Sequence, residues 1–106
     1  PIFMEHRQID WHKNALQVHN LVRGLAPYPA AITTLNNKIF KIYKTHIFLD
    51  KHNIAVGTVE IVHAGSEHHD SYIRFAVPDG WVYIDELQQE GKKQMDTSSF
   101  LNGYRD

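Results

Sequence analysis

The sequence contains no cysteine, carries almost no net charge and has no long hydrophobic run. Without cysteine the chain can form neither a disulfide framework nor a zinc ribbon, so a hydrophobic core must stabilise the fold. The formal net charge of −1 argues against a uniformly basic nucleic-acid binder. The longest uncharged segment, residues 24–37, contains two prolines and is not uniformly apolar, which excludes a transmembrane helix there. These absences favour a protein of the reducing cytoplasm with no membrane partner.

The chain has the length and composition of one compact domain. Its 106 residues include 42% hydrophobic and 22% charged side chains, which is typical of a globular protein with a true core. Residues 1–8 are predicted to be the extended end of an interdomain linker, and residues 9–106 the folded domain. A chain that starts at proline suggests a piece of a longer protein, and we expect it to be monomeric.

Charge is unevenly distributed along the sequence. Residues 11–49 contain five basic side chains and no acidic one, whereas residues 50–90 contain eight acidic side chains and two basic ones, Lys51 and Arg74. A fold that keeps these halves apart would have a basic side and an acidic side, and could orient a phosphate-rich partner. An ordinary mixed surface is the alternative interpretation.

Two segments have the signature of helices. Residues 14–23 carry apolar side chains at three- and four-residue steps, which predicts one buried stripe. Asn14 is a good capping residue, and Gly24 is predicted to end the helix in the left-handed conformation. A shorter helix is predicted over residues 97–102, with Asp96 as its N-cap.

Between the helices the apolar period changes to two, with many β-branched and aromatic residues, which predicts strands. Five are expected, over residues 31–35, 39–49, 57–62, 72–77 and 81–87. Asn36-Asn37 suits a two-residue hairpin turn because asparagine tolerates positive φ, and Pro78-Asp79-Gly80 suits a second tight turn. The fold class that follows is mainly β: a small, partly open Greek-key barrel of the oligonucleotide-binding type, with an N-terminal helix and a short C-terminal helix.

The eight histidines invite a metal-binding interpretation. His63, His68 and His69 lie with Glu67 and Asp70 in one predicted loop, and imidazole and carboxylate groups suit zinc or nickel. Adjacent histidines rarely converge on one ion. A solvated polar loop is therefore the simpler interpretation, and no metal site is assigned.

Motifs for catalysis are missing from the sequence. There is no nucleophile elbow and no glycine-rich loop that could cradle a phosphate. Asp85 and Glu86 are expected on opposite faces of a strand, which separates them as an acid–base pair. His19 is expected to be a partly buried, hydrogen-bonded helix residue. No catalytic residue is assigned, and the chain alone is not expected to be an enzyme.

Basic and aromatic residues are interleaved on one predicted strand. Lys41, Tyr43 and Lys44 could contact phosphates and stack on unpaired bases, as side chains of oligonucleotide-binding barrels do. Lys38, Lys41 and Lys44 are spaced by three, so a twist or bulge would be needed to gather them on one face. The alternative is that Tyr43 fills a crevice and the lysines are solvated.

Two blocks of the sequence resemble the C-terminal domain of methionyl-tRNA formyltransferases. The first comprises Ile9-Asp10-Trp11, residues 18–25 and Pro27-Tyr28-Pro29-Ala30-Ala31; the second comprises Leu87-Gln88, Gly91-Lys92-Lys93, Met95, Phe100-Leu101, Gly103 and Arg105. Between them, Leu35-Asn36-Asn37-Lys38, Lys41-Ile42-Tyr43-Lys44 and Gly57-Thr58-Val59 also match in order. Departures from the family pattern are mild: Tyr28 and Tyr43 replace tryptophan, Asn37 a turn glycine, Gln94 a basic residue and His12 a capping serine.

The resemblance implies a binding role for this chain rather than chemistry. The family transfers a formyl group from 10-formyltetrahydrofolate to methionine on initiator tRNA, with catalysis in an N-terminal Rossmann-like domain, and its C-terminal barrel helps to hold the tRNA. The expected partners are therefore initiator tRNA and that catalytic domain. This domain needs no cofactor of its own, while the parent enzyme uses 10-formyltetrahydrofolate. The expected phosphate contacts are Lys38, Lys41, Lys44, Lys92 and Lys93, with Arg23 and Arg105 as further candidates.

Several of these assignments have alternatives. Arg23, at a helix end, could instead pair with Asp10. The expected packing and turn residues of the first block are Trp11, Pro27, Tyr28 and Pro29. The whole domain could also be the accessory barrel of another folate-dependent formyltransferase, or a protein-interaction barrel with Trp81 and Tyr83 on an exposed apolar face.

Overall fold

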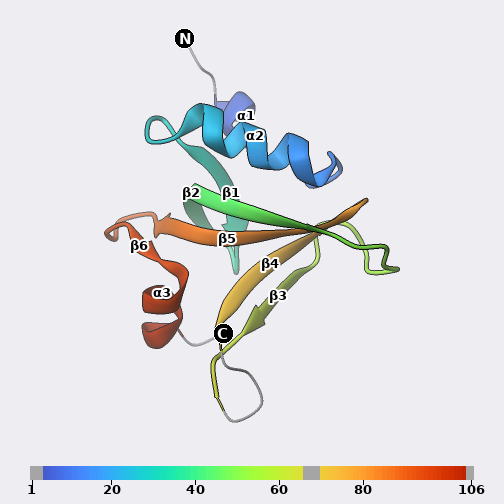
Figure 1. Ribbon diagram of the computed structural model, residues 1–106. Helices are drawn as coiled ribbons and strands as arrows, with labels where there is room; N and C mark the ends of the chain where they lie inside the picture. The colour runs from blue at the N-terminus through green and yellow to red at the C-terminus, as the bar shows by residue number, and fades with distance from the viewer. Residues whose placement is uncertain (1–3, 66–69, 105–106) are drawn as a thin grey trace.

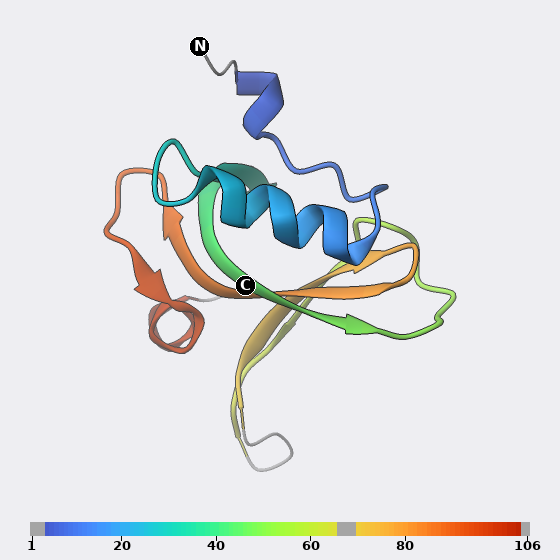
Figure 2. The ribbon, with the colours of Figure 1, turned by 45° about the horizontal axis from the view of Figure 1, so that its top comes forward.

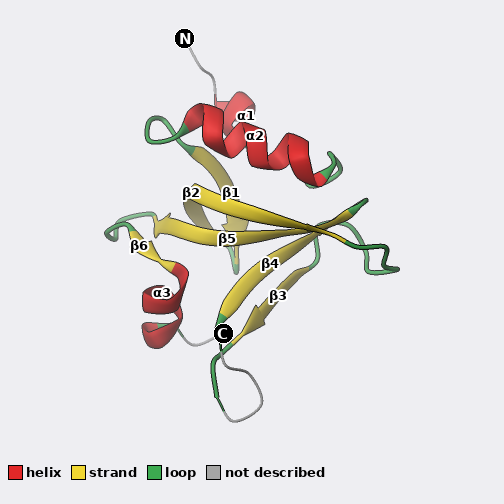
Figure 3. Ribbon diagram, viewed as in Figure 1, coloured by secondary structure: helices red, strands yellow, loops and turns green. Residues whose placement is uncertain are grey.

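The computed structural model describes residues 4–65 and 70–104 of the chain. Helices and strands follow one another in that part of the chain as shown in Figures 1 and 3. They are α1 (Met4–Arg7), α2 (Ala15–Leu25), β1 (Ala31–Leu35), β2 (Lys38–Leu49), β3 (Val59–Val62), β4 (Tyr72–Val77), β5 (Gly80–Gln89), β6 (Met95–Asp96) and α3 (Thr97–Gly103). No helix among the described residues is long and apolar enough to cross a lipid bilayer.

The strands form one antiparallel sheet in the order β1-β2-β5-β4-β3, and β6 pairs with the second half of β5. The order of β2 to β5 is a Greek key, because β3, β4 and β5 are consecutive neighbours and β2 lies beside β5. Within the described residues the outer strands β1 and β3 do not pair with each other, so the sheet stays open. The predicted fold class is confirmed, and the two-residue β6 adds a sixth strand that was not predicted.

Both predicted hairpin turns are present. Asn36 and Asn37 adopt φ values of 51° and 64°, in the left-handed region that asparagine tolerates, and join β1 to β2. Gly80 begins β5 directly after the β4–β5 turn. A Cβ atom added to Gly80 would overlap the carbonyl oxygen of Phe48 and lie 2.8 Å from the Cα atom of Leu49. Any larger residue would therefore displace the backbone of β2.

Helix α2 starts with a capping box, which identifies its N-cap as Asn14. The Asn14 side chain accepts a hydrogen bond from the backbone of Gln17, and the Gln17 side chain accepts one from the backbone of Asn14. The prediction that Gly24 ends the helix is wrong, because α2 continues to Leu25, whose side chain packs on the core. The helix ends just before Pro27, which has no N–H with which to extend it.

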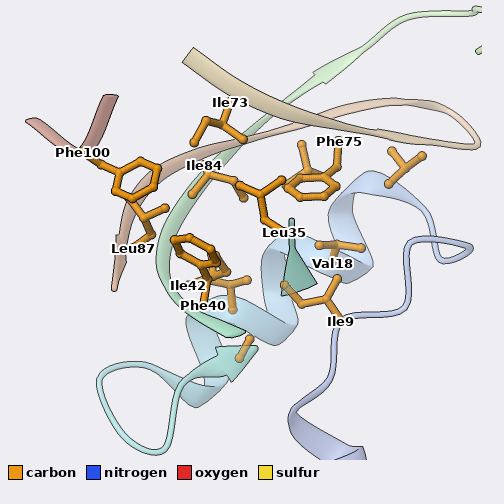
Figure 4. Packing of buried hydrophobic residues seen from close by; sticks show 14 of the residues in the cluster. Ile9, Val18, Leu35, Phe40, Ile42, Ile73, Phe75, Ile84, Leu87 and Phe100 are labelled. Atoms are coloured by element: carbon orange, nitrogen blue, oxygen red, sulfur yellow. The ribbon is translucent and has the colours of Figure 1, made fainter. Parts of the chain in front are cut away.

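The hydrophobic core lies between the sheet and the two longer helices (Figure 4). Val18 of α2, Phe40 of β2 and Phe75 of β4 are each at most 4% exposed. The ring of Trp11 stacks flat on that of Phe75, with centroids 4.1 Å apart, which confirms its packing role. Phe100 of α3 meets Phe40 edge-on at a centroid distance of 5.4 Å. Helix α3 is therefore fastened to the core by an aromatic side chain.

The segment that precedes α2 is bound to the rest of the domain. Residues 4–7 form a helical turn, so the expected extended conformation is wrong there. The Arg7 guanidinium donates hydrogen bonds to the carbonyl oxygens of Ala30 (2.9 Å) and Pro29 (2.8 Å). These long-range bonds hold α1 against the α2–β1 loop, and a reading of local sequence could not anticipate them.

Candidate nucleic-acid interface

Four of the lysines predicted to contact phosphates lie where β2 begins and β5 ends. Lys38 and Lys41 are in the first residues of β2, and Lys92 and Lys93 are in the loop that joins β5 to β6. The two segments are neighbours, because the β2–β5 ladder pairs Lys41 with Gln88. The α2–β1 loop and the β5–β6 loop lie on the same side of the molecule (Figure 2). We call this group of four lysines the basic end.

A bulge in β2 places Tyr43 and Lys44 on the same side of the strand as Lys41. The pairing register with β5 shifts around Lys44, and both residues lie between Ile42 and Thr45, which are buried. Tyr43 and Lys44 are therefore both directed away from the core. The bulge brings Lys41 and Lys44 to one face of β2. Lys38 precedes the bulge and alternates with Lys41 to the other face, so the three lysines do not all share a face.

Gln88 connects this face of β2 to the β5–β6 loop. Its side-chain oxygen accepts a hydrogen bond from the Tyr43 hydroxyl (2.6 Å), and its amide group donates to the Lys92 carbonyl (2.7 Å). The loop closes through a bond from the Lys92 N–H to the Gln89 carbonyl (2.9 Å), and Gly91 takes a φ of 82°. The backbone that carries Lys92 is thus braced on both sides.

Lys44 differs from the lysines of the basic end because an acidic group neutralises it. Its Nζ lies 3.1 Å from Oε2 of Glu86, and its side chain is 68% exposed. An exposed pair of this kind contributes about 0–1 kcal/mol, so a phosphate could compete for the ammonium group. Lys44 is therefore a weaker candidate contact than Lys41.

The prediction that Asp85 and Glu86 occupy opposite strand faces is wrong. They follow one another between Ile84 and Leu87, which are both buried, and both are partly exposed. The cause is the irregular register that also produces the bulge in β2. Each carboxylate has its own cationic or ring partner, since Asp85 lies 2.9 Å from Nδ1 of His46 and Glu86 binds Lys44. They do not form an acid–base pair.

A hollow lies on each side of the β5–β6 loop. The β2 hollow is lined by residues that include Arg7, Ile32, Lys41, Gln88 and Glu90. The α3 hollow has a volume of about 210 Å³ and is lined by residues that include Gln89, Lys92, Lys93, Met95, Phe100 and Tyr104. Both combine apolar walls with cationic side chains, and among the described lining residues only those of the α3 hollow include aromatic rings, on which bases can stack.

Of the two arginines predicted to contact phosphates, the structure describes Arg23 only. Arg23 is exposed in the last turn of α2, and its guanidinium is 3.5 Å from the Asn20 side-chain oxygen. The alternative pairing with Asp10 is wrong, because that carboxylate accepts a hydrogen bond from the backbone of His12, which lowers the pKa of Asp10. Arg105 lies outside the described residues. Pro27, Tyr28 and Pro29 form the turn after α2, as expected, and Tyr28 is a turn residue rather than a packing residue because it is 85% exposed.

The aromatic face suggested for a protein partner is covered from within the domain. The Arg74 guanidinium lies 3.7 Å from the ring centre of Trp81 and donates hydrogen bonds to Glu60 (2.6 Å) and the Tyr83 hydroxyl (3.0 Å). Burial acts to lower the pKa of Arg74, but these hydrogen bonds outweigh it and raise the pKa. Trp81 is 3% exposed, so it is not available to a partner.

One histidine has a structural role, and the histidines proposed as metal ligands lie in a loop that the structure describes only in part. His19 forms a hydrogen bond of 2.8 Å with the Thr45 hydroxyl, which confirms it as a partly buried helix residue. The predicted metal loop includes Glu67, His68 and His69, which lie outside the described residues. In the rest of the chain, the part that the structure describes, no group of three or more His, Cys, Asp or Glu side chains could hold a metal ion.

The chain matches a protein-family model described as "Formyl transferase, C-terminal domain" over residues 1–105. The chain belongs to this family. Similar proteins include methionyl-tRNA formyltransferases of Phocaeicola vulgatus, 37% identical over 98% of this chain and 32% of that protein, and of Pelobacter propionicus, 42% identical over 93% of this chain and 28% of that protein. The enzyme of Clostridium novyi is 36% identical over 90% of this chain and 29% of that protein. The formyl transferase domain thus spans about a third of the length of the curated relatives it matches, and the resemblance seen in the sequence is confirmed.

Three side chains of this site were overlooked in the sequence. Arg7 lines the β2 hollow from the segment predicted as linker, and Gln88 and Tyr104 have no charge that marks them as contacts. Gln88 stands in a block that resembles the family, which was the available signal. Its role as a brace depends on Tyr43, 45 residues away along the chain.

Proposed function

We propose that this domain binds and orients initiator methionyl-tRNA for a methionyl-tRNA formyltransferase of which it is the C-terminal part. The observation that carries the proposal is the basic end, where Lys38 and Lys41 of β2 lie beside the hydrogen-bonded loop that carries Lys92 and Lys93. The name shared by the similar proteins supports the choice of RNA. It favours this function over that of an accessory barrel in another folate-dependent enzyme.

The formyl transfer itself is assigned to another part of the parent protein. The chain matches about a third of its relatives' length, and we place the chemistry in an N-terminal Rossmann-like domain that uses 10-formyltetrahydrofolate. We assign no catalytic residue to this chain. The parent enzyme would act in the cytoplasm as a monomer, at translation initiation.

The contribution of the domain is electrostatic and positional. Exposed ammonium groups bind phosphate oxygens and release condensed counterions, which gives affinity without sequence specificity. The acidic residues Glu60 and Glu86 are paired with Arg74 and Lys44, which reduces their repulsion of an RNA backbone. A domain of net charge −1 can therefore still bind RNA through its basic end.

The test compares the salt dependence of initiator tRNA binding in two variants of the chain. The triple variant Lys41→Ala, Lys92→Ala, Lys93→Ala should bind more weakly, and the slope of log K against log salt should fall by about 2–3, roughly 0.9 for each lost duplex phosphate contact. Lys51→Ala is the control, because Lys51 is exposed as Lys92 and Lys93 are but lies in the β2–β3 connection. An unchanged slope in the triple variant, or an equal change in the control, would contradict the proposal.

A further inference from the structure

The α3 hollow has an apolar wall that is built on the core. Phe100 is 8% exposed and stacks on Tyr104, with ring centroids 4.7 Å apart and planes inclined by 28°. The Tyr104 hydroxyl accepts a hydrogen bond from the side-chain amide of Asn36 in the β1–β2 turn. Met95, half-buried on β6, also lines the hollow. Two rings and a thioether are thus held in place before any ligand arrives.

The other residues that line the α3 hollow form a cationic and polar rim. Lys92 and Lys93 line it from the loop that Gln88 braces, and both are exposed. Gln89 adds an amide with donor and acceptor atoms, and Ser99 a hydroxyl. None of the described lining residues is acidic. The β2 hollow, by contrast, includes Glu90.

We propose that the α3 hollow binds one unpaired nucleotide of the RNA that the domain holds, an inference that rests on the proposed function. The base lies against Tyr104 and Met95, and its phosphate is held by Lys92 and Lys93. An aromatic wall accepts the π face of any base, and the Gln89 amide can pair with a base edge. The volume of about 210 Å³ is below the roughly 300 Å³ at which small-molecule pockets begin, which suits a single base.

The chemistry of the hollow favours an unpaired nucleotide over its other possible occupants. Bases inside a duplex are stacked on one another, so a double helix could reach the lysines but not the wall formed by Tyr104. An apolar peptide side chain could pack against the wall, but it would leave Lys92 and Lys93 without a counter-charge. The ligand that uses both the wall and the rim carries a flat ring and an anionic group.

The test uses the chain with a single-stranded RNA that contains 2-aminopurine and with the same strand annealed to its complement. The single strand should bind more tightly than the duplex, and its fluorescence should be quenched as the base stacks. Tyr104→Ala should weaken single-strand binding by about 5- to 150-fold, the range that one lost stacking contact gives, with duplex binding and the salt slope unchanged. Tyr104→Phe keeps the ring and should bind nearly as the unmodified chain does. Leu16→Ala, at another exposed apolar side chain, is the control.

The outcomes separate this inference from the proposed function. If Tyr104→Ala binds both RNAs normally while Lys92→Glu with Lys93→Glu weakens both, the nucleotide site is refuted and RNA binding stands. If the lysine variants also bind normally, the proposed function fails, and the nucleotide site with it. If Tyr104→Ala fails to fold, the unmodified chain is enough for the test. Quenching of 2-aminopurine in the single strand but not in the duplex supports the site. Equal quenching in both RNAs, or none in either, overturns it.

Discussion

Replacing Gln88 with alanine tests whether the sheet braces the loop that carries Lys92. The change removes the bond from the Tyr43 hydroxyl (2.6 Å) and the bond to the Lys92 carbonyl (2.7 Å). A hydrogen bond contributes about 0.5–1.5 kcal/mol net, and the first bond is worth the upper value because the half-buried Tyr43 hydroxyl loses its partner. The second is exposed, so water replaces it at low cost. The free energy of unfolding should therefore fall by about 2 kcal/mol, and the Tm by about 10 °C.

Urea unfolding measures the loss of stability, and hydrogen exchange measures whether the loop that carries Lys92 opens more easily. Tyr43→Phe is the matched control, because it removes the first bond alone and should cost about 1 kcal/mol. The two substitutions should not add in the double variant, since they remove the same bond. The amide of Lys92 should exchange faster in Gln88→Ala than in Tyr43→Phe. If Gln88→Ala has the free energy of unfolding of the unmodified chain, or leaves Lys92 protected, the loop is not braced in this way.

Further substitutions test the fold that supports the site. Phe100→Ala should lower the free energy of unfolding by about 3–5 kcal/mol in urea, since it opens a cavity between α3 and the core; a loss below about 1 kcal/mol would contradict the packing. Gly80→Ala should destabilise the fold in thermal melts because its Cβ overlaps the backbone at Phe48. Gly24→Ala should instead add about 0.5–1 kcal/mol, because an added Cβ in α2 has nothing within 4 Å. The N–H of Ser99 lowers the pKa of Asp96 in the folded state. The stability that this carboxylate contributes is therefore complete above its unfolded pKa of about 3.9 and is lost as pH falls through the lower folded value. Acid titration of Asp96→Asn should lack that loss.

The parts of the fold that depend on local chemistry could be predicted from the sequence. Asn36 and Asn37 form a turn because of their own tolerance for positive φ, and Asp96 caps α3 through a bond to the residue three positions on. The alternation of apolar and polar residues is also a local pattern, and it correctly predicted the positions of the longer strands. These features need no knowledge of what lies across the sheet.

The features that were missed depend on residues far apart along the chain. Helix α1 is held by Arg7, which reaches the α2–β1 loop more than twenty residues away. Gly24 remains helical because Leu25 packs on the core, an effect that its own conformational freedom does not reveal. The two-residue β6 has no period of its own and exists because β5 provides a partner.

The candidate site was predictable in its residue types but not in its geometry. Lys41, Lys92 and Lys93 stood out as cations, and β2 has a bulge that brings Lys41 and Lys44, but not Lys38, to one face. Nothing in the sequence said that Gln88 would join the strand to the loop, or that Tyr104 would face the same hollow as the lysines. These arrangements follow from tertiary pairing of β2, β5 and α3.

RNA binding by this domain is tested by its affinity for initiator tRNA across a range of salt concentrations. Binding is expected at low salt, with log K falling linearly against log salt and a slope of about −3 to −4 for the four lysines of the basic end. The same titration with a neutral polymer should give no binding. An absence of tRNA binding at low salt, or an affinity that does not change with salt, would contradict the assignment of this domain as an RNA-binding element.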